Sequence, residues 1–233
     1  MIQIAPKLDS AALRLAMDEA CLLAAEEGEL GPSLRVWSFA DPVVVLGRSS
    51  KVDEEVNREF CREHDITILR RCSGGASIVG GPGCLMYSVV LSNADHPSVA
   101  KIDGAHELVM ARILAAVRRQ LPDAELNGIC DLTLAGRKFS GNALRVTRTH
   151  VLYHGTMLMT ADTDLVAGSL AFAPRQPDYR AGRGHGDFIT NVKLNVAQLT
   201  RDLAGGFEAD PGVPPESVIE RAVRLAATRY SRD

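Results

Sequence analysis

Residues 70–77 read Arg-Arg-Cys-Ser-Gly-Gly-Ala-Ser, and a second glycine cluster, Gly-Gly-Pro-Gly, follows at residues 80–83. Glycine allows the backbone to adopt positive φ angles and to turn its N–H groups toward one point, which forms a concave site for an anion. Arginine adds a planar fork of donors that fits a carboxylate or a phosphate. The stretch therefore predicts a cradle for an organic acid or its phosphate ester.

The segments on either side of this loop limit how it can bind. Residues 67–72 and 85–91 predict a strand that enters the loop and an apolar strand that leaves it. No Gly-Lys-Ser/Thr follows, which excludes a Walker A motif, and a following strand does not fit the dinucleotide-binding fingerprint. Because side chains alternate along a strand, at most one of Arg70 and Arg71 faces a cleft. We expect this of Arg71, and we expect Arg70 to meet solvent or a carboxylate.

A second segment with a chemical signature covers residues 131–143, Asp-Leu-Thr-Leu-Ala-Gly-Arg-Lys-Phe-Ser-Gly-Asn-Ala. Lysines at strand starts are mostly solvated, and Arg137 fits that description. Lys138, however, is followed by an aromatic and two small residues, which suggests a chain that enters a cleft. A lysine ammonium there could bind an acyl carboxylate and polarise its carbonyl when an amine attacks.

Five segments, in this order, resemble the lipoate–protein ligase A and octanoyltransferase superfamily, whose catalytic domain shares its fold with biotin protein ligases. They are residues 13–19, 43–57, 70–88, 131–143 and 154–158. The resemblance implies an enzyme that attaches a lipoyl or octanoyl group to a lysine of a lipoyl-carrier domain. Such domains occur in 2-oxoacid dehydrogenase complexes and in the glycine cleavage H protein.

The same resemblance assigns roles to individual residues. Lys138 takes the catalytic role, because the matching lysine of the family does this work. The residues implied at the nucleotide are Arg71, Ser73, Gly74, Gly75, Ala76, Ser77, Ile78, Val79, Asp131 and Lys138. Those implied at the acyl substrate are Arg71, Gly75, Lys138, Gly141, Ala143, His154, Gly155 and Thr156. Asp131 would lie near the nucleotide and any Mg²⁺.

His154 allows two interpretations. A lone histidine in an apolar strand is more often a satisfied core residue than a catalyst, but Gly155 and Thr156 beside it suggest that a ligand approaches closely. No HExxH or Cys/His ligand spacing is present, so we expect no structural zinc and no other protein-held metal.

The cysteines matter because part of this superfamily carries the acyl group as a cysteine thioester. Cys72, Cys84 and Cys130 adjoin the predicted site segments. None occupies the position at which the resemblance would place the acyl-carrying cysteine, and no histidine is close in sequence to lower a thiol pKa. We expect them to pack as small apolar residues, although the sequence leaves their reactivity open.

Two departures from the family pattern keep three functions open. The third loop glycine is Ala76, which fits if its φ is negative, and Gly80 stands where a histidine is usual. Complete ligases also carry a further C-terminal domain, whereas about 60 residues follow residue 173 here. The first hypothesis is a ligase that uses ATP and Mg²⁺ to form an acyl-adenylate of lipoate or octanoate, aided by a separate small ligase-partner protein. The others are an ATP-independent octanoyltransferase fed by acyl carrier protein and a non-catalytic acyl-binding or ligase-partner subunit.

Hydrophobic periodicity predicts the elements around these segments. Two helices are expected to begin at residues 10 and 53, and three more are expected at residues 105–121, 162–172 and 216–230. A loop is expected at residues 173–187. Further strands are expected at residues 34–39, 43–46, 132–135, 138–147 and 150–159. Strands without regular βαβ alternation indicate an α+β fold, a mixed and largely antiparallel sheet packed by helices. We assign residues 1–200 to the acyl-transfer catalytic domain and residues 201–233 to a C-terminal helical extension packed on it.

Composition fits a compact cytoplasmic protein. The net charge of −3 over 233 residues gives no broad attraction for nucleic acid or an anionic membrane. Five cysteines without a CxxC pair fit a reducing compartment better than a disulfide framework. No apolar run approaches the length of a membrane span, and the first residues are not expected to form a signal peptide.

Overall fold

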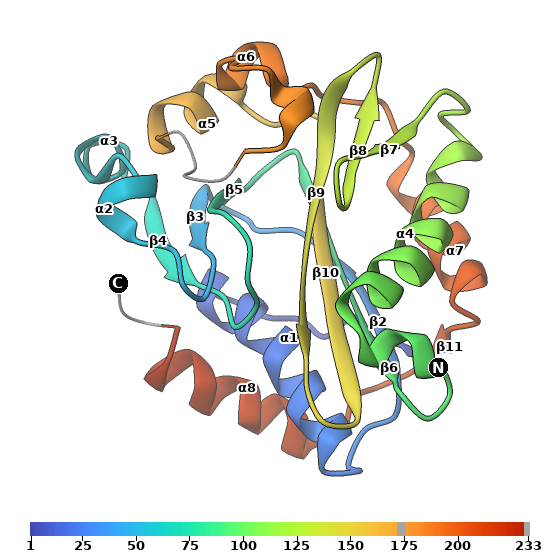
Figure 1. Ribbon diagram of the computed structural model, residues 1–233. Coiled ribbons are helices and arrows are strands. Elements are labelled where there is room, and N and C mark those ends of the chain that lie inside the picture. Colours follow the sequence, from blue (N-terminus) through green and yellow to red (C-terminus); the bar gives the residue numbers. More distant parts are fainter. Residues whose placement is uncertain (172–175, 231–233) are drawn as a thin grey trace.

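The computed structural model describes residues 1–171 and 176–230 (Figure 1). Among these residues, eight strands form one sheet in the order β11-β1-β2-β6-β10-β9-β8-β7. The central strands pair antiparallel, whereas β1 runs parallel to both β2 and β11, so the sheet is mixed and the predicted α+β class is confirmed. In sheet order the strands are Asp210–Pro211, Ile2–Gln3, Ser33–Trp37, Cys84–Ser92, His150–Leu158, Arg137–Val146, Asp131–Leu134 and Glu125–Asn127.

A second, small sheet carries the glycine-rich loop. Its strands are β3 (Val43–Leu46), β4 (Thr67–Arg70) and β5 (Ile78–Gly80), in the order β4-β3-β5. The predicted strand 67–72 ends two residues early, because the chain turns into the loop after Arg70. Strand β5 was not predicted; it pairs antiparallel with β3 and carries the loop back toward β6.

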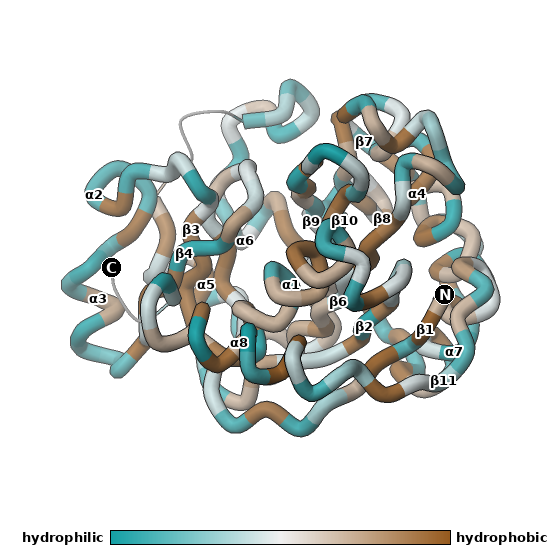
Figure 2. Tube along the Cα trace, turned by 90° about the horizontal axis from the view of Figure 1, so that it is seen from below, coloured by the Kyte–Doolittle hydropathy of each residue, from teal (hydrophilic) through white to brown (hydrophobic). Residues whose placement is uncertain are grey.

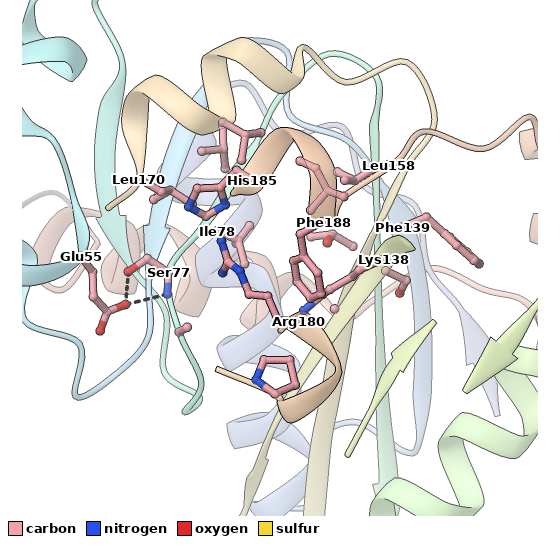
Figure 3. A pocket seen from close by; sticks show the side chains of 18 of the residues that line it. Glu55, Ser77, Ile78, Lys138, Phe139, Leu158, Leu170, Arg180, His185 and Phe188 are labelled. Carbon is pink, nitrogen blue, oxygen red and sulfur yellow. Dashed lines mark hydrogen bonds between the residues drawn. The ribbon is translucent and has the colours of Figure 1, made fainter. Parts of the chain in front are cut away.

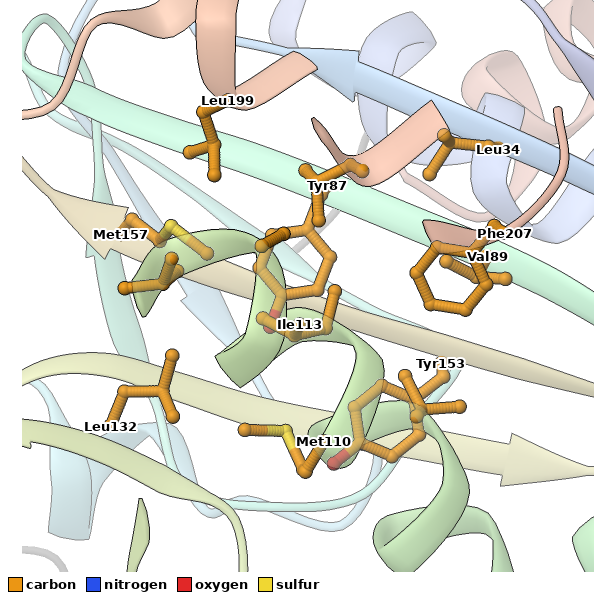
Figure 4. Close-up of a cluster of buried hydrophobic side chains, with 14 of the residues drawn as sticks. Leu34, Tyr87, Val89, Met110, Ile113, Leu132, Tyr153, Met157, Leu199 and Phe207 are labelled. Atoms are coloured by element: carbon orange, nitrogen blue, oxygen red, sulfur yellow. The ribbon is translucent and has the colours of Figure 1, made fainter. Parts of the chain in front are cut away.

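Helices cover both faces of the large sheet. On one face, α4 (Ile102–Arg118) and α7 (Val196–Gly206) pack on apolar side chains of β2, β6 and β10 (Figure 4). On the other face lie α1 (Ala11–Glu26) and α8 (Glu216–Thr228), which share a core cluster with Val90 of β6 and Leu152 of β10. The large sheet is therefore the central layer, and the alternation of side chains along β6 and β10 supplies both cores.

Most predicted helices are present with shifted ends. The helix predicted at residues 105–121 is α4, which begins three residues earlier. Asp162 caps α5 (Thr163–Ser169) as expected, although the last residue of that prediction, 172, lies outside the described residues. The predicted loop at 173–187 contains, in its described part, η2 (Asp178–Arg180) and the start of α6 (His185–Phe188).

The helix predicted from Asp53 through Phe60 is wrong. The chain forms two short helices, α2 (Val52–Glu55) and α3 (Arg58–Glu63), which lie at the hydrophilic edge of the molecule in Figure 2. Val56 between them is extended and pairs with Leu170, and the Asn57 side chain caps α3 by accepting from the Phe60 N–H at 3.1 Å. Pairing with a distant segment thus overrides the local helical pattern and leaves Glu55 at the end of a turn.

The boundary predicted after residue 200 falls inside α7. Leu199 and Leu203, on either side of it, belong to the same core cluster. The division of the chain into a catalytic part and an extension stays a prediction. No helix among the described residues is both long enough and apolar enough to cross a membrane.

Candidate functional site

Two adjoining cavities lie between the large sheet and the glycine-rich loop. The α1 cavity, of about 130 Å³, is bounded by residues of α1, β2, β6, β9 and β10. The α6 cavity, of about 150 Å³, is bounded by residues of α2, α5, α6 and β9 (Figure 3). Both are lined by Ala76, Ser77, Ile78, Lys138, Gly141 and Thr156. These shared residues make the two cavities parts of one cleft.

Both cavities combine apolar and charged side chains. Apolar side chains of Leu15, Trp37, Val45 and Met86 form much of the α1 cavity. The α1 cavity also contains the charged or titratable groups of Asp18, Arg71 and His154. The α6 cavity is likewise largely apolar, and Figure 3 shows its charged or titratable groups: Glu55, Lys138, Arg180 and His185. The cleft is thus suited to a ligand with an apolar part and a polar part.

Most of the predicted site residues line this cleft. The α1 cavity receives Arg71, Gly75, Ala143, His154 and Gly155 in addition to the shared residues, and the α6 cavity receives Val79. Three predicted residues, Ser73, Gly74 and Asp131, line neither cavity. Asp131 still contacts the site through Lys138, and Ser73 contacts it through Arg71 and His154.

Arg71 is the arginine that faces the cleft, as predicted, but its donors hold the loop itself. Its Nη2 donates to the carbonyl oxygens of Gly74 at 2.5 Å and Ala76 at 2.9 Å, and its Nη1 donates to Val45 at 3.2 Å. Burial lowers the pKa of Arg71 to about 10. The guanidinium therefore shapes the loop rather than offering the whole of its fork to a ligand. Arg70 donates to the carbonyls of Gly47 and Ser50.

The loop backbone explains its composition. Gly75 has φ +87°, and a Cβ on it would lie 2.8 Å from Nη2 of Arg71. Only glycine combines this conformation with so close an approach. Ala76 lies outside the positive-φ region, which confirms that alanine fits there.

Lys138 stands where the two cavities meet. It is the second residue of β9 and its side chain is 28% exposed, and its Nζ lies 2.8 Å from Oδ1 of Asp131. The other carboxylate oxygen of Asp131 accepts from the Tyr179 hydroxyl at 2.8 Å. Burial, followed by the charge of Asp131, raises the pKa of Tyr179. Asp131 thus ties the lysine to the segment that leads into α6.

The described residues offer no preformed metal site. They contain no group of three or more His, Cys, Asp or Glu side chains that could hold a metal ion. Asp131, which the resemblance places near Mg²⁺, has both oxygens bonded to Lys138 and Tyr179. Magnesium is commonly held by one or two carboxylates together with substrate phosphates, so an ion here would depend on the phosphates.

Sequence reasoning missed two acids of the site, Asp18 and Glu55. Glu55 ends α2 and accepts from both the N–H of Ser77 at 2.8 Å and its hydroxyl at 2.7 Å. Burial alone would raise the pKa of Glu55, but the two Ser77 bonds and weaker effects of Ser50 and Arg71 lower it. The signal was present in the acidic run 53–55, but such runs usually form solvated faces.

Asp18 lies on α1 and lines the α1 cavity beside His154. Nδ1 of His154 is 3.0 Å from Oδ2 of Asp18, and Nε2 is 2.6 Å from the hydroxyl of Ser73. Both interpretations of the histidine therefore apply in part. It borders the cleft, yet both of its ring nitrogens are bonded within the protein.

No cysteine among the described residues lines either cavity. Cys72 and Cys84 are buried and Cys130 is half-buried, and all three are free thiols. Burial raises the pKa of each to about 11. A raised pKa disfavours the thiolate, which is the nucleophilic form, and this fits the expectation that these residues serve packing.

Comparison with known proteins agrees with the fold and the segments. Residues 10–203 match the sequence model of the lipoyl protein ligase A/B catalytic domain. An octanoyltransferase LipM of Geobacillus kaustophilus is 26% identical over 95% of this chain and 92% of its own length. Lipoate–protein ligase 1 of Staphylococcus aureus is 30% identical over 85% of this chain and 56% of its own length. The chain thus spans about half the length of the ligase and most of the transferase.

Solved structures share the fold at low sequence identity. A bi-partite lipoate protein ligase from Thermoplasma acidophilum gives a TM-score of 0.84 at 22% identity, covering 100% of this chain and 93% of the other. A lipoate–protein ligase A bound with ATP gives 0.83 at 22% identity, covering 100% and 96%. The named relatives are enzymes of lipoyl or octanoyl attachment. The chain belongs to the lipoyl protein ligase A/B catalytic domain family.

Proposed function

We propose that this enzyme transfers a lipoyl or octanoyl group from an acyl-adenylate to the ε-amine of a lysine on a lipoyl-carrier domain. The observation that carries the proposal is the position of Lys138 where two cavities meet, each of which combines apolar side chains with charged ones. An acyl-adenylate also has two parts that meet at one group, because a carbonyl joins its alkyl chain to its phosphate.

The α1 cavity suits the alkyl chain. Leu15, Trp37 and Met86 present apolar surface there, and burial of each CH₂ group contributes about 0.8 kcal/mol to binding. The α6 cavity suits the nucleotide, because Lys138 and Arg180 supply positive charge for the phosphate. Arg180 is itself ordered against the Phe188 ring, with its guanidinium carbon 4.8 Å from the ring centroid.

The chemistry then follows from the carbonyl beside Lys138. The amine of the carrier lysine adds to the carbonyl carbon, and negative charge develops on the carbonyl oxygen. The ammonium group of Lys138 stabilises this charge. The carbonyl C–O bond to the phosphate breaks, AMP leaves with the electron pair, and the amine loses a proton as the amide forms. ATP is the substrate of the preceding activation of the free acid.

The second candidate is octanoyl transfer from acyl carrier protein without ATP. It is favoured by the match to LipM transferases over most of their length. The lining of the cleft argues against a thioester route, because no cysteine among the described residues lines either cavity. Carrier domains of 2-oxoacid dehydrogenases and the H protein are the proposed acceptors. The structural analysis of the Thermoplasma ligase describes an E2 lipoyl domain as part of the same lipoylation system, which supports this choice.

A mass measurement on an apo lipoyl domain separates these routes. Three donors are compared: preformed lipoyl-adenylate, lipoate with ATP and Mg²⁺, and octanoyl acyl carrier protein. We expect the adenylate to give much the fastest modification, because its reaction needs only the groups that line the cleft. A separate small partner protein should raise the rate from lipoate with ATP. If the lipoyl domain is modified only from octanoyl acyl carrier protein, the second candidate is favoured. If it is modified from none of the three donors, the proposal is overturned.

A further inference from the structure

A chain of hydrogen bonds runs from the glycine-rich loop to α1 beneath the α1 cavity. Nε of Arg71 donates to the hydroxyl of Ser73 at 3.0 Å. The hydroxyl of Ser73 is 2.6 Å from Nε2 of His154, whose Nδ1 is 3.0 Å from Oδ2 of Asp18. Three segments far apart in the sequence are thereby connected: α1, the loop and β10.

The donor and the acceptor of each hydrogen bond in this chain follow from the ionised state of Asp18. Oδ1 of Asp18 accepts from Arg35 and from the Ser88 hydroxyl, the latter at 2.7 Å. Burial raises the pKa of Asp18, but Arg35, His154 and Ser88 outweigh it and leave the pKa lowered. An ionised carboxylate only accepts, so the proton of the imidazole is on Nδ1. In the neutral ring Nε2 then accepts from Ser73, whose oxygen accepts in turn from Arg71.

The order Ser–His–Asp is that of a hydrolytic triad, but Ser73 is not placed to act as a nucleophile. It is 1% exposed and lines neither cavity. Its oxygen is already the acceptor of the bond from Arg71. A nucleophile must reach the carbonyl carbon, and this hydroxyl faces the interior.

We propose that Asp18 and His154 are positioning residues, which fix Ser73 and through it the Arg71 side chain that shapes the loop. Arg71 holds the carbonyls of Gly74 and Ala76, and the adjoining residues 75–78 line the cleft. The chain of bonds thus sets the position of the loop edge that would contact the acyl phosphate. The inference deepens the proposed function and rests on it for its effect on transfer.

The structure provides a matched control in Ser88. Like Ser73, it is a buried serine whose hydroxyl bonds within the same polar cluster. It contacts Asp18 from β6 and lies outside the connection to the loop. Ser88→Ala therefore removes a comparable bond without breaking the chain between His154 and Arg71.

Hydrogen exchange tests the positioning independently of activity. Ser73→Ala and His154→Gln should raise exchange of the amides at residues 74–78 by about 10-fold or more, because opening of the loop becomes easier. Ser88→Ala should leave exchange at these residues near the wild-type rate. Equal exchange in Ser73→Ala and Ser88→Ala would overturn the inference whether or not the protein transfers acyl groups.

Transfer kinetics then test the coupling. With preformed lipoyl-adenylate, Ser73→Ala and His154→Gln should each lower kcat/KM about 10-fold, and the double variant should lose little more than one single variant, because both break one chain. If the losses in kcat/KM of the two single variants instead multiply in the double variant, Ser73 and His154 act independently, which would contradict the inference. Intact-mass analysis during turnover should show no acyl adduct on Ser73, and such an adduct would make Ser73 a nucleophile. An inactive wild-type protein would refute the proposed function alone, since the exchange result stands separately.

Discussion

Gly75 is the position at which the glycine-rich loop tolerates least change. Its φ of +87° is strained for any L side chain, and its missing Cβ leaves room for Arg71. Gly74 beside it has no such restriction, because φ is not positive and a Cβ there would meet no atom within 4 Å. The two neighbours therefore have different roles in the loop.

Gly75→Val should abolish binding of a non-hydrolysable acyl-adenylate analogue, because a β-branched side chain opposes positive φ and displaces Arg71. Calorimetric titration measures the affinity. Gly74→Ala is the matched control and should bind within about 3-fold of the wild-type protein, in line with the small effect of unhindered substitutions. An unchanged affinity in Gly75→Val would show that the loop is a structural turn only.

At the scale of the elements, Glu26 connects the end of α1 to the turn between β9 and β10. One carboxylate oxygen accepts from the hydroxyls of Thr147 at 2.6 Å and Thr149 at 2.8 Å and from the Thr149 N–H at 2.8 Å. Burial alone would raise the pKa of Glu26, but these bonds lower it from 4.5 to about 2. The ionised form is therefore the one that the fold prefers.

This preference makes stability depend on pH in acid. Because the folded pKa is below the unfolded one, the stabilisation is complete above about pH 4.5 and is lost as the pH falls toward 2. Glu26→Gln should lower the free energy of unfolding at pH 7, and the difference from wild type should shrink as the pH drops through this range. Denaturant melts at several pH values measure it. A difference that stays constant with pH would contradict the assigned role.

The two residues that follow α8, Arg229 and Tyr230, are held by a buried acid. Glu19 of α1 accepts from the Tyr230 hydroxyl at 2.6 Å, from Arg229 at 2.7 Å and from Arg145 of β9 at 2.6 Å. Glu19 is fully buried, so removal of any one of these donors leaves its carboxylate without a hydrogen bond that water cannot replace. The C-terminal helix is thus tied both to α1 and to the large sheet.

Tyr230→Phe should destabilise the protein by about 1–3 kcal/mol, the cost of leaving a buried acceptor without its donor. Chemical denaturation gives the free energy of unfolding. Arg224→Ala, which removes an exposed pair with Glu220 at 3.9 Å, is the control and should change it by about 0.5 kcal/mol or less. Equal effects of the two substitutions would mean that the Glu19 cluster does not anchor α8.

At the scale of the whole molecule, the sequence predicted what depends on local signals. Glycines around Arg71 and the small residues after Lys138 identified two walls of the cleft, and alternating apolar residues located β8, β9 and β10 to within about one residue. These features follow from backbone freedom and from side-chain period, which single segments carry.

The features that the sequence did not predict depend on contacts between distant segments. Asp18 and Glu55 are single acids on or beside helices, and only folding turns them toward His154 and Ser77. Tyr179 lies in a Pro- and Arg-rich segment with no period, and its bond to Asp131 spans 48 positions. The helix from residue 53 breaks because Val56 pairs with Leu170. Helix α7 is the exception, because Leu199 and Leu203 recur at a spacing of four that could have been recognised.

The most direct test of the central claim is the rate at which Lys138→Ala modifies an apo lipoyl domain from preformed lipoyl-adenylate, followed by intact mass. We expect a loss of about 10²-fold or more, comparable to losing a donor to a developing oxyanion. Lys101→Ala, an exposed lysine beside α4 and outside the cleft lining, should keep the wild-type rate. Full activity in a folded Lys138→Ala protein would contradict the account, because acyl transfer would then not depend on the residue at which the two cavities meet.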